Sequence, residues 1–359
     1  MTDSTVASGL TVQQWDAKFF KEYLEESRFN SEMGTSSNNI IQLKSDLTKK
    51  KGDSITYALV NRLTGAGVTG SSTLEGNEEE MDSRSFKLTV NKIRNAVRVA
   101  EIDEQFSAIS LRGAAKEVLK DWMMEQTRDD IITALGMING VAYGSATEGN
   151  KDAWLVDNAD RVLFGDALGN GGYTDHSADL LTVTAGMTFG AAEAQLMKRI
   201  AMTAGPKIRP IRTTNDERWY ITYCDSRTFR DFKADTVIQQ ANRDAWQRGK
   251  DNPLFTGGDL VYDGMIFKEI PDIASLGTVG NASAAVSPVY MCGAQAIALG
   301  WAKKTTSKSE TFDYGDKVGC AVEEIRGIEK IVFGSGSSDV ADLKDHGIVT
   351  GYFGAAADA

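Results

Sequence analysis

Residues 54–90 read SITYALVNRLTGAGVTGSSTLEGNEEEMDSRSFKLTV and place two alternating apolar segments around a glycine-rich, acidic middle. Apolar residues occupy every second position from Ile55 to Leu59, and again from Phe86 to Val90. A period of two is typical of half-buried β-strands. The stretch therefore predicts a long hairpin with a glycine-rich tip.

The apolar positions change parity just beyond this hairpin. They fall on even numbers at Phe86, Leu88 and Val90 and on odd numbers at Ile93, Val97 and Val99. A shift of one residue turns a strand's apolar side chains to the opposite face, and a bulge is the usual way to accommodate it. A bulge or bend is therefore predicted near Asn91 and Lys92.

The tip of the hairpin contains a literal GxGxxG, from Gly65 to Gly70. A dinucleotide-binding loop needs its glycines between a strand and the N-terminus of a helix. The residues that follow do not predict a helix, and Glu78, Glu79 and Glu80 would repel phosphate groups. We interpret the segment as a flexible tip, with a nucleotide-binding α/β enzyme as the alternative.

Composition narrows the class of protein. The 359 residues are 42% hydrophobic, enough for a substantial core, and carry a net charge of -11, which disfavours electrostatic binding of nucleic acid as the main activity. The three cysteines form neither a disulfide framework nor a zinc-binding spacing. The sequence contains no run of eighteen apolar residues and begins without the features of a signal peptide, so no membrane partner is predicted.

Residue types suited to catalysis or metal binding are sparse. The chain has two histidines, His176 and His346, which removes most histidine-based catalytic schemes. Asp175, His176 and Asp179 could be considered a metal cluster, but they lie in a Gly/Ser/Asp-rich segment and are interpreted as solvated loop residues. We expect no catalytic residues, no metal ligands and no cofactor.

The N-terminal region predicts a short helix with an aromatic stripe. Thr11 is suited to the N-cap with Gln14 as its capping-box partner, and Trp15, Phe19 and Tyr23 follow at helical spacing. These three aromatic residues need a surface to lie on. They are predicted to contact a neighbouring subunit.

Beyond the hairpin, the pattern predicts a long amphipathic helix and then an α/β region. The helix is expected over 104–139, with Val118 among its inward residues. Further expected elements are strands at 161–164, 180–183, 219–224, 289–292, 318–325 and 329–333, a hairpin at 260–267 turning at Asp263-Gly264, and helices at 189–204, 236–248 and 294–303, with one more capped by Asp225 or Ser226.

The order of these segments suggests a role in assembly. Residues 30–53 show little periodicity, so residues 1–53 are predicted to form an arm rather than a core element. A two-stranded hairpin is marginally stable alone, because it makes too few apolar contacts to offset the ordering of its backbone. Neighbouring copies of the same chain would satisfy both the arm and the hairpin, and such contacts repeat as rings or lattices.

Three segments carry a family resemblance: GDSITYALVNRLTGAGVTGSSTLEGNEEE, AAKEVLKDWMMEQTRDDIITALG and SPVYMCGAQAIALGWAKK. With the order of elements, they resemble the major capsid proteins of tailed bacteriophages with the Hong Kong 97-like (HK97-like) fold, in the branch similar to N-four-like phages. The resemblance implies an α+β fold with an N-terminal arm at 1–53, an E-loop hairpin at 54–100, a P-domain at 101–185 with a long spine helix at 104–139, an A-domain at 186–304, and returning P-domain strands with a C-terminal tail at 305–359.

The resemblance also implies a function. Copies would self-assemble as hexamers and pentamers into an icosahedral shell around double-stranded DNA, in the virion, after assembly in the cytoplasm of the host bacterium. Glu78, Glu79, Glu80 and Arg84 would form ion pairs between subunits, and the acidic chain would touch DNA weakly and non-specifically.

Further partners follow from the same resemblance: a portal, and a scaffold or decoration proteins. Some relatives cross-link neighbours through a hairpin lysine; Lys87 and Lys92 lie on the hairpin here, without a predicted acceptor. A non-viral shell protein of the encapsulin type remains the alternative within the same fold.

Overall fold

The computed structural model describes residues 29–45, 52–60, 63, 65, 67–71, 73–79, 81, 83–107, 109–166, 173–212, 217–246, 260–335 and 340–356. The chain divides into two compact units. The small unit comprises described residues of 92–127 and 303–325, and the large unit comprises described residues of 28–91, 128–302 and 326–359. Four elements have residues in both units: β5 (Asn91–Ala100), α2 (Leu111–Leu135), β12 (Ile297–Phe312) and β13 (Lys317–Lys330).

The large unit is built around a seven-stranded mixed sheet among the described residues. Its order is β6 (Val162–Phe164), β16 (Ile348–Gly354), β11 (Val286–Cys292), β8 (Arg218–Cys224), β10 (Met265–Glu269) and β9 (Leu260–Tyr262), with β7 (Ile211–Arg212) paired to β8. Every residue of β11 and β16 is buried, which explains their nearly continuous apolar sequence.

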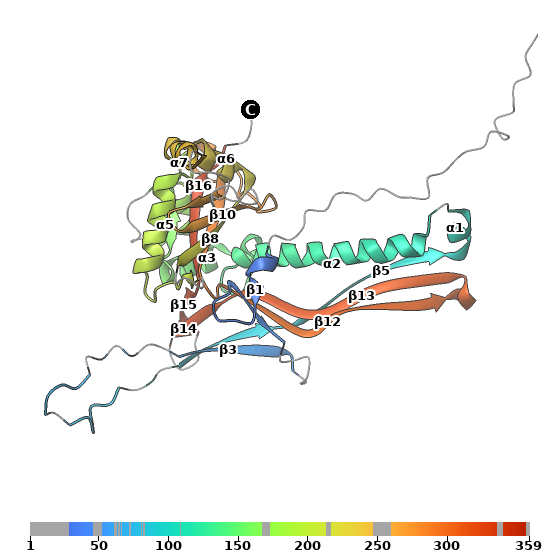
Figure 1. The fold of residues 1–359 in the computed structure, drawn as a ribbon, viewed down its shortest axis with the longest axis horizontal. Helices are drawn as coiled ribbons and strands as arrows, with labels where there is room; N and C mark the ends of the chain where they lie inside the picture. The colour runs from blue at the N-terminus through green and yellow to red at the C-terminus, as the bar shows by residue number, and fades with distance from the viewer. Residues whose placement is uncertain are drawn as a thin grey trace, which may run out of the picture. The chain divides into compact units, whose positions relative to one another are not determined.

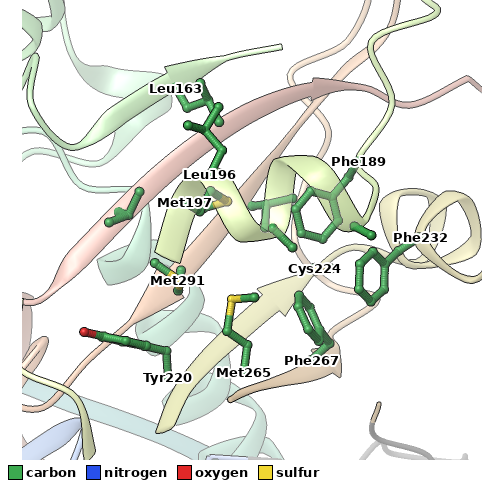
Figure 2. Close-up of a cluster of buried hydrophobic side chains, with 14 of the residues drawn as sticks. Leu163, Phe189, Leu196, Met197, Tyr220, Cys224, Phe232, Met265, Phe267 and Met291 are labelled. Atoms are coloured by element: carbon green, nitrogen blue, oxygen red, sulfur yellow. The ribbon is translucent and has the colours of Figure 1, made fainter. Parts of the chain in front are cut away.

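Helices α5 (Ala191–Thr203), α6 (Ser226–Ala234) and α7 (Thr236–Trp246) gather around strands of this sheet (Figure 1). The buried rings of Phe189, Phe232 and Phe267 pack together between α5, α6 and β10, as Figure 2 shows. The ring centroids of Phe232 and Phe267 are 4.3 Å apart. This aromatic core fixes the helices on the sheet.

In this region, two predictions from local sequence signals are confirmed: a helix cap and a hairpin turn. The carboxylate of Asp225 caps α6, because Oδ1 accepts a hydrogen bond of 2.7 Å from the backbone N–H of Thr228. The hairpin of β9 and β10 turns at Asp263 and Gly264, whose φ angles of 47° and 72° are those of a turn that favours Asp-Gly.

Helix α3 (Glu148–Asp157) and a two-stranded sheet of β14 (Val332–Ser335) and β15 (Ala341–Asp345) meet at a buried ion pair. Lys330 Nζ lies 2.6 Å from Asp345 Oδ2, and the two side chains are 2% and 1% exposed. Trp154 Nε1 donates a hydrogen bond of 3.1 Å to the same oxygen. The pair joins the end of β13, the end of β15 and α3.

The segment 29–45 differs from the expectation that it would lie outside the core. It contains β1 (Met33–Gly34) and β2 (Ile41–Lys44), and β2 pairs in parallel with the start of β12, Ile41 opposite Ile297. The side chains of Phe29, Ile40 and Ile41 are fully buried. Short strands of this kind lack enough residues to show a period, so the sequence pattern missed them.

The small unit contains β5 (Asn91–Ala100), which pairs with β13, and β13 in turn pairs with β12. The predicted single helix over 104–139 is wrong at its start, because α1 (Glu101–Phe106) ends before α2 begins at Leu111. The Glu104 carboxylate accepts hydrogen bonds from the hydroxyl of Ser110 and the backbone N–H of Arg112, which replaces helix hydrogen bonds at the break.

Two further predictions are wrong: the inward direction of Val118 on α2 and the helix at 294–303. Val118 is exposed, and the next residue, Leu119, faces inward with Met123. The predicted helix at 294–303 is instead the beginning of β12, whose apolar run is buried on both faces and therefore carries no strand period.

The predicted strand at 180–183 is the end of a helix followed by a turn, because the chain forms α4 (His176–Leu180) there. Among the described residues, short 3-10 helices are η2 (Asn30–Glu32), η4 (Tyr143–Ser145), η6 (Asn281–Ser283) and η7 (Asp313–Gly315). Within the described residues, no helix is long and apolar enough to cross a membrane.

The predicted hairpin is confirmed as β3 (Ser54–Val60) paired antiparallel with β4 (Ser83–Thr89), in a register that places Val60 opposite Ser83. Near the predicted bend the strand is interrupted. β4 ends at Thr89 and β5 begins at Asn91, with Val90 between them.

The close approach of β4 to β13 gives a stability prediction. A Cβ on Gly327 would overlap the carbonyl oxygen of Thr89 and lie 3.2 Å from Leu88 Cγ. Gly327→Ala should therefore destabilise the protein by about 1–3 kcal/mol, as overpacking does. The change is measured as a lower midpoint of thermal unfolding.

The matched control is Gly149→Ala on α3, where a Cβ would meet nothing within 4 Å. Alanine in a helix is more stable than glycine by roughly 0.5–1 kcal/mol, so this variant should keep or raise the midpoint. Equal midpoints for the two variants would show that the contact at Gly327 is not tight.

Candidate assembly surfaces

The base of the β3–β4 hairpin is firmly anchored in the large unit. Ile55, Tyr57 and Leu88 are buried against Ala298 and Ile331. Gly300 makes room for them, because a Cβ there would lie 2.6 Å from Ile55 Cδ1 and 2.9 Å from Leu88 Cδ2. The hairpin therefore projects from a fixed root.

Past this root, the hairpin and the loop it carries expose large apolar side chains. We call residues 63–81 the acidic loop. Val60, Leu74 and Met81 are 57%, 64% and 67% exposed, and Leu63 is similarly exposed. Four large apolar side chains exposed along one projecting segment are candidates for contact with another molecule.

Hydrogen bonds from its own glutamates shape the acidic loop. Glu79 Oε2 accepts from the backbone N–H of Gly65 at 2.7 Å, which ties the two sides of the loop together across fourteen residues. Glu78 Oε2 accepts from the N–H of Gly76 at 2.7 Å. Gly76 has a φ of 84°, a left-handed conformation that suits glycine.

These contacts argue against a phosphate-binding loop. The segment after Gly70 forms turns and then β4, and none of its described residues begins a helix. A dinucleotide site would need that helix N-terminus. The glycine-rich tip predicted from the sequence is confirmed.

The predicted contact residues lie in different places. Glu78 and Glu79 are exposed in the acidic loop, and Arg84 is half-buried on β4 opposite Leu59. Glu80 and the aromatic residues Trp15, Phe19 and Tyr23 fall outside the described residues. Their role between subunits stays a prediction.

A cluster of cations in the small unit was not predicted. We call it the basic face: Lys92, Lys303 and Lys308 surround the Glu323 carboxylate, and Arg94 and Arg98 lie farther along β5 at exposed positions. The ammonium groups of Lys92 and Lys308 lie 3.0 and 2.6 Å from the Glu323 carboxylate, and Lys303 also contacts it. Hydrogen bonds from Lys303, Lys308 and Lys92 hold the pKa of Glu323 well below its usual range.

Side chains alternate between the two sides of a strand, so the basic face lies on one side of this sheet and a buried apolar face lies on the other. Ile93 on β5 and Cys320 and Val322 on β13 pack against Leu119 and Met123 of α2. The intervening residues of the same strands point to the opposite side of the sheet.

The distal part of the basic face is held by an aromatic contact. The guanidinium of Arg98 lies 4.6 Å from the centroid of the Phe312 ring. The same ring covers Gly319 of β13, where a Cβ would lie 2.8 Å from it. Lys92, Arg94 and Arg98 occupy even positions of β5, a spacing visible in the sequence that could have revealed this face.

The residues considered as a metal cluster have structural roles. Asp175 caps α4 through a hydrogen bond of 2.9 Å from the N–H of Ala178, and Asp152 accepts one of 2.8 Å from the N–H of His176. The interpretation of His176 as a solvated loop residue is wrong. It is buried beside the rings of Tyr143 and Tyr352, and desolvation, with Lys151 adding to it, lowers its pKa to about 4.

The carboxylates of Glu148, Asp152 and Asp175 come within 4.8 Å of one another beside this histidine. Two of the three already accept hydrogen bonds from backbone amides. A nearby hollow of about 950 Å³ is lined mainly by apolar groups, among them Ile132, Leu181 and Tyr290. Neither feature assembles the nucleophile, base and oxyanion donors of a hydrolytic site.

The lowered pKa of Glu323 gives a prediction on pH. A carboxyl group with a depressed folded-state pKa stabilises the fold above its unfolded value and loses that stabilisation as the pH falls. Wild-type protein should therefore be more stable than Glu323→Gln at neutral pH. This difference should shrink as the pH falls below 4.5, the usual pKa of the group. Urea unfolding midpoints from pH 7 to 3 measure it.

Glu310→Gln, at an exposed position of β12, is the control for loss of one carboxylate. Its difference from wild type should stay small across this range. If Glu323→Gln shows the same flat profile, the three lysines do not act on Glu323 in solution.

Comparisons with known proteins find similarity to phage capsid proteins. Residues 3–356 match the family described as phage capsid protein. The major capsid protein of Pseudomonas phage KPP25 is 27% identical over 364 residues, covering 95% of this chain and 94% of that protein.

Two solved structures are similar over the full length of both chains. A chain of the Cyanophage Pam1 capsid asymmetric unit is 34% identical with a TM-score of 0.89. A chain of the capsid of Ralstonia phage GP4 is 19% identical with a TM-score of 0.78, a likeness of fold.

Proposed function

The chain belongs to the phage capsid protein family, as a major capsid protein with the HK97-like fold that forms the shell of a tailed phage, and we propose how its copies hold one another. The β3–β4 hairpin and the N-terminal arm of each copy clamp neighbouring copies. The similar structures are phage capsids, which favours a phage shell over the encapsulin-type alternative.

The observation that carries this proposal is the contrast between the two ends of the hairpin. Its root is buried against Ala298 and Ile331, whereas Val60, Leu74 and Met81 are more than half exposed. A rigid root can hold the loop at a fixed distance, and exposed apolar groups gain free energy when a second copy covers them.

We assign the parts of the chain by family resemblance. The arm spans about 1–53, the E-loop 54–100, the P-domain 101–185 with 305–359, and the A-domain 186–304. The burial of Phe29, Ile40 and Ile41 shows that part of this arm, residues 29–45, packs in the core of the large unit. The aromatic residues Trp15, Phe19 and Tyr23 then lie on the part that reaches a neighbour.

We further propose hexamers and pentamers of this chain in an icosahedral shell, with a portal and scaffold or decoration proteins as partners, assembled in the host bacterial cytoplasm. The net charge of -11 supports weak, non-specific contact with packaged double-stranded DNA, because tight contact would need many cations against the phosphates. The role of the chain is structural rather than catalytic.

Removal of the acidic loop tests the clamp. Residues 61–82 are replaced by Asn-Gly, a two-residue turn that suits the antiparallel register of Val60 opposite Ser83. The root contacts remain, so the subunit should fold with an unchanged circular dichroism spectrum. Closed particles should be absent by negative-stain electron microscopy and sedimentation.

A variant that keeps the loop length but replaces Leu63, Leu74 and Met81 by serine separates the loss of apolar contacts from the loss of reach. It should assemble poorly at subunit concentrations that suffice for the wild type. Closed particles of normal size from the shortened chain would rule out the clamp.

A further inference from the structure

We propose that the junction of α3 and α4 binds one divalent metal ion, with Zn²⁺ as the ion that fits best. The site lies within the large unit and does not depend on how copies hold one another. Its ligands are the carboxylates of Glu148, Asp152 and Asp175 and the imidazole of His176. This differs from the expectation of no metal ligands, which treated His176 as solvated.

The first observation is a convergence of carboxylates from two helices. Glu148 and Asp152 lie one turn apart on α3, and Asp175 is the N-cap residue of α4. One carboxylate oxygen of each lies within 4.8 Å of the other two. Lys151 Nζ, 3.7 Å from Glu148 Oε2, offsets one of these three charges. The remaining like charges repel one another at this distance, so a divalent cation between them stabilises the junction.

The second observation is a buried imidazole nitrogen that faces this cluster. The His176 side chain is 1% exposed, and its Nδ1 lies 3.8 Å from Glu148 Oε1. That distance is too long for a hydrogen bond, and no described residue gives Nδ1 another partner. The other nitrogen, Nε2, lies 3.5 Å from the hydroxyl of Tyr352. An ion between Nδ1 and the carboxylates supplies the partner that this buried nitrogen lacks.

A fourth acidic residue beside the ligands also has an unsatisfied oxygen. Asp179 follows Asp175 by one helical turn, and its backbone N–H donates to the Asp175 carbonyl at 2.9 Å. Its Oδ2 is buried and has no hydrogen-bond partner among the described residues. An unmodelled ion or water is a common reason for such an oxygen. Asp179 therefore adds negative charge next to the proposed ion.

Backbone hydrogen bonds orient two of the three carboxylates. Asp152 Oδ1 accepts 2.8 Å from the N–H of His176, and Asp175 Oδ1 accepts 2.9 Å from the N–H of Ala178. Each carboxylate keeps lone pairs for a metal, and metal-bound carboxylates commonly accept such bonds. Three carboxylates and one imidazole make a four-coordinate set suited to Zn²⁺. Ca²⁺ and Mg²⁺ prefer oxygen ligands alone.

Zinc binding by the purified full chain tests the site. After removal of metals with EDTA, calorimetric titration with Zn²⁺ should show one site per chain that involves these ligands. Free Zn²⁺ at a hundredfold excess over Kd should raise the midpoint of thermal unfolding by about 5 °C. Parallel titrations with Ca²⁺ and Mg²⁺ should show weaker binding.

Two variants should each weaken zinc binding about tenfold or more. Glu148→Gln with Asp175→Asn removes two charges, and asparagine at 175 can still cap α4. His176→Phe removes both ring nitrogens and keeps an aromatic ring. The matched control is Glu217→Gln with Asp263→Asn, the same charge change at exposed positions of the large unit. It should bind Zn²⁺ as wild type does.

Several outcomes would overturn the inference. If the wild-type chain binds no Zn²⁺ at millimolar concentration, Lys151 alone offsets the carboxylates. If the charge variant binds Zn²⁺ as tightly as wild type, the ion binds elsewhere, and this result decides even where His176→Phe fails to fold. If Ca²⁺ binds more tightly than Zn²⁺ and His176→Phe binds like wild type, the imidazole is not a ligand and the assignment to Zn²⁺ is wrong.

Discussion

The structure depends on the close approach of the β3–β4 hairpin to strands β12 and β13. Two glycines permit it: Gly300 makes room for Ile55 and Leu88, and Gly327 lies under the carbonyl of Thr89. Side chains at either position would separate the hairpin from the sheet. The direction in which the hairpin leaves the sheet follows from these two contacts.

Much of the fold was predictable where the sequence signal is local. Alternation identified β3 and β4, the change of parity identified the break at Val90, and Asp225 and Asp263-Gly264 identified a helix cap and a turn. The failures share a cause. β2 and the start of β12 are strands because they pair with each other across about 250 residues of sequence, and their burial on both faces removes the period that would reveal them.

The two candidate assembly surfaces also differ in how far the sequence reveals them. The acidic loop could be found from one stretch of sequence, but only the β5 part of the basic face could, because Lys92, Lys308 and Glu323 come from three strands and become neighbours only when the sheet forms. The loop glutamates also have a role that composition does not indicate. Glu78 and Glu79 bind backbone amides of their own loop, so they give it shape as well as charge.

The buried pair of Lys330 and Asp345 limits how these two positions can change during evolution. Loss of one partner would strand a charge beside Trp154 in the interior, a change that typically costs 3–5 kcal/mol, whereas simultaneous replacement of both by apolar residues is often neutral. Neither position can drift independently. Related chains should therefore keep lysine and aspartate at these two sites together or have exchanged them together.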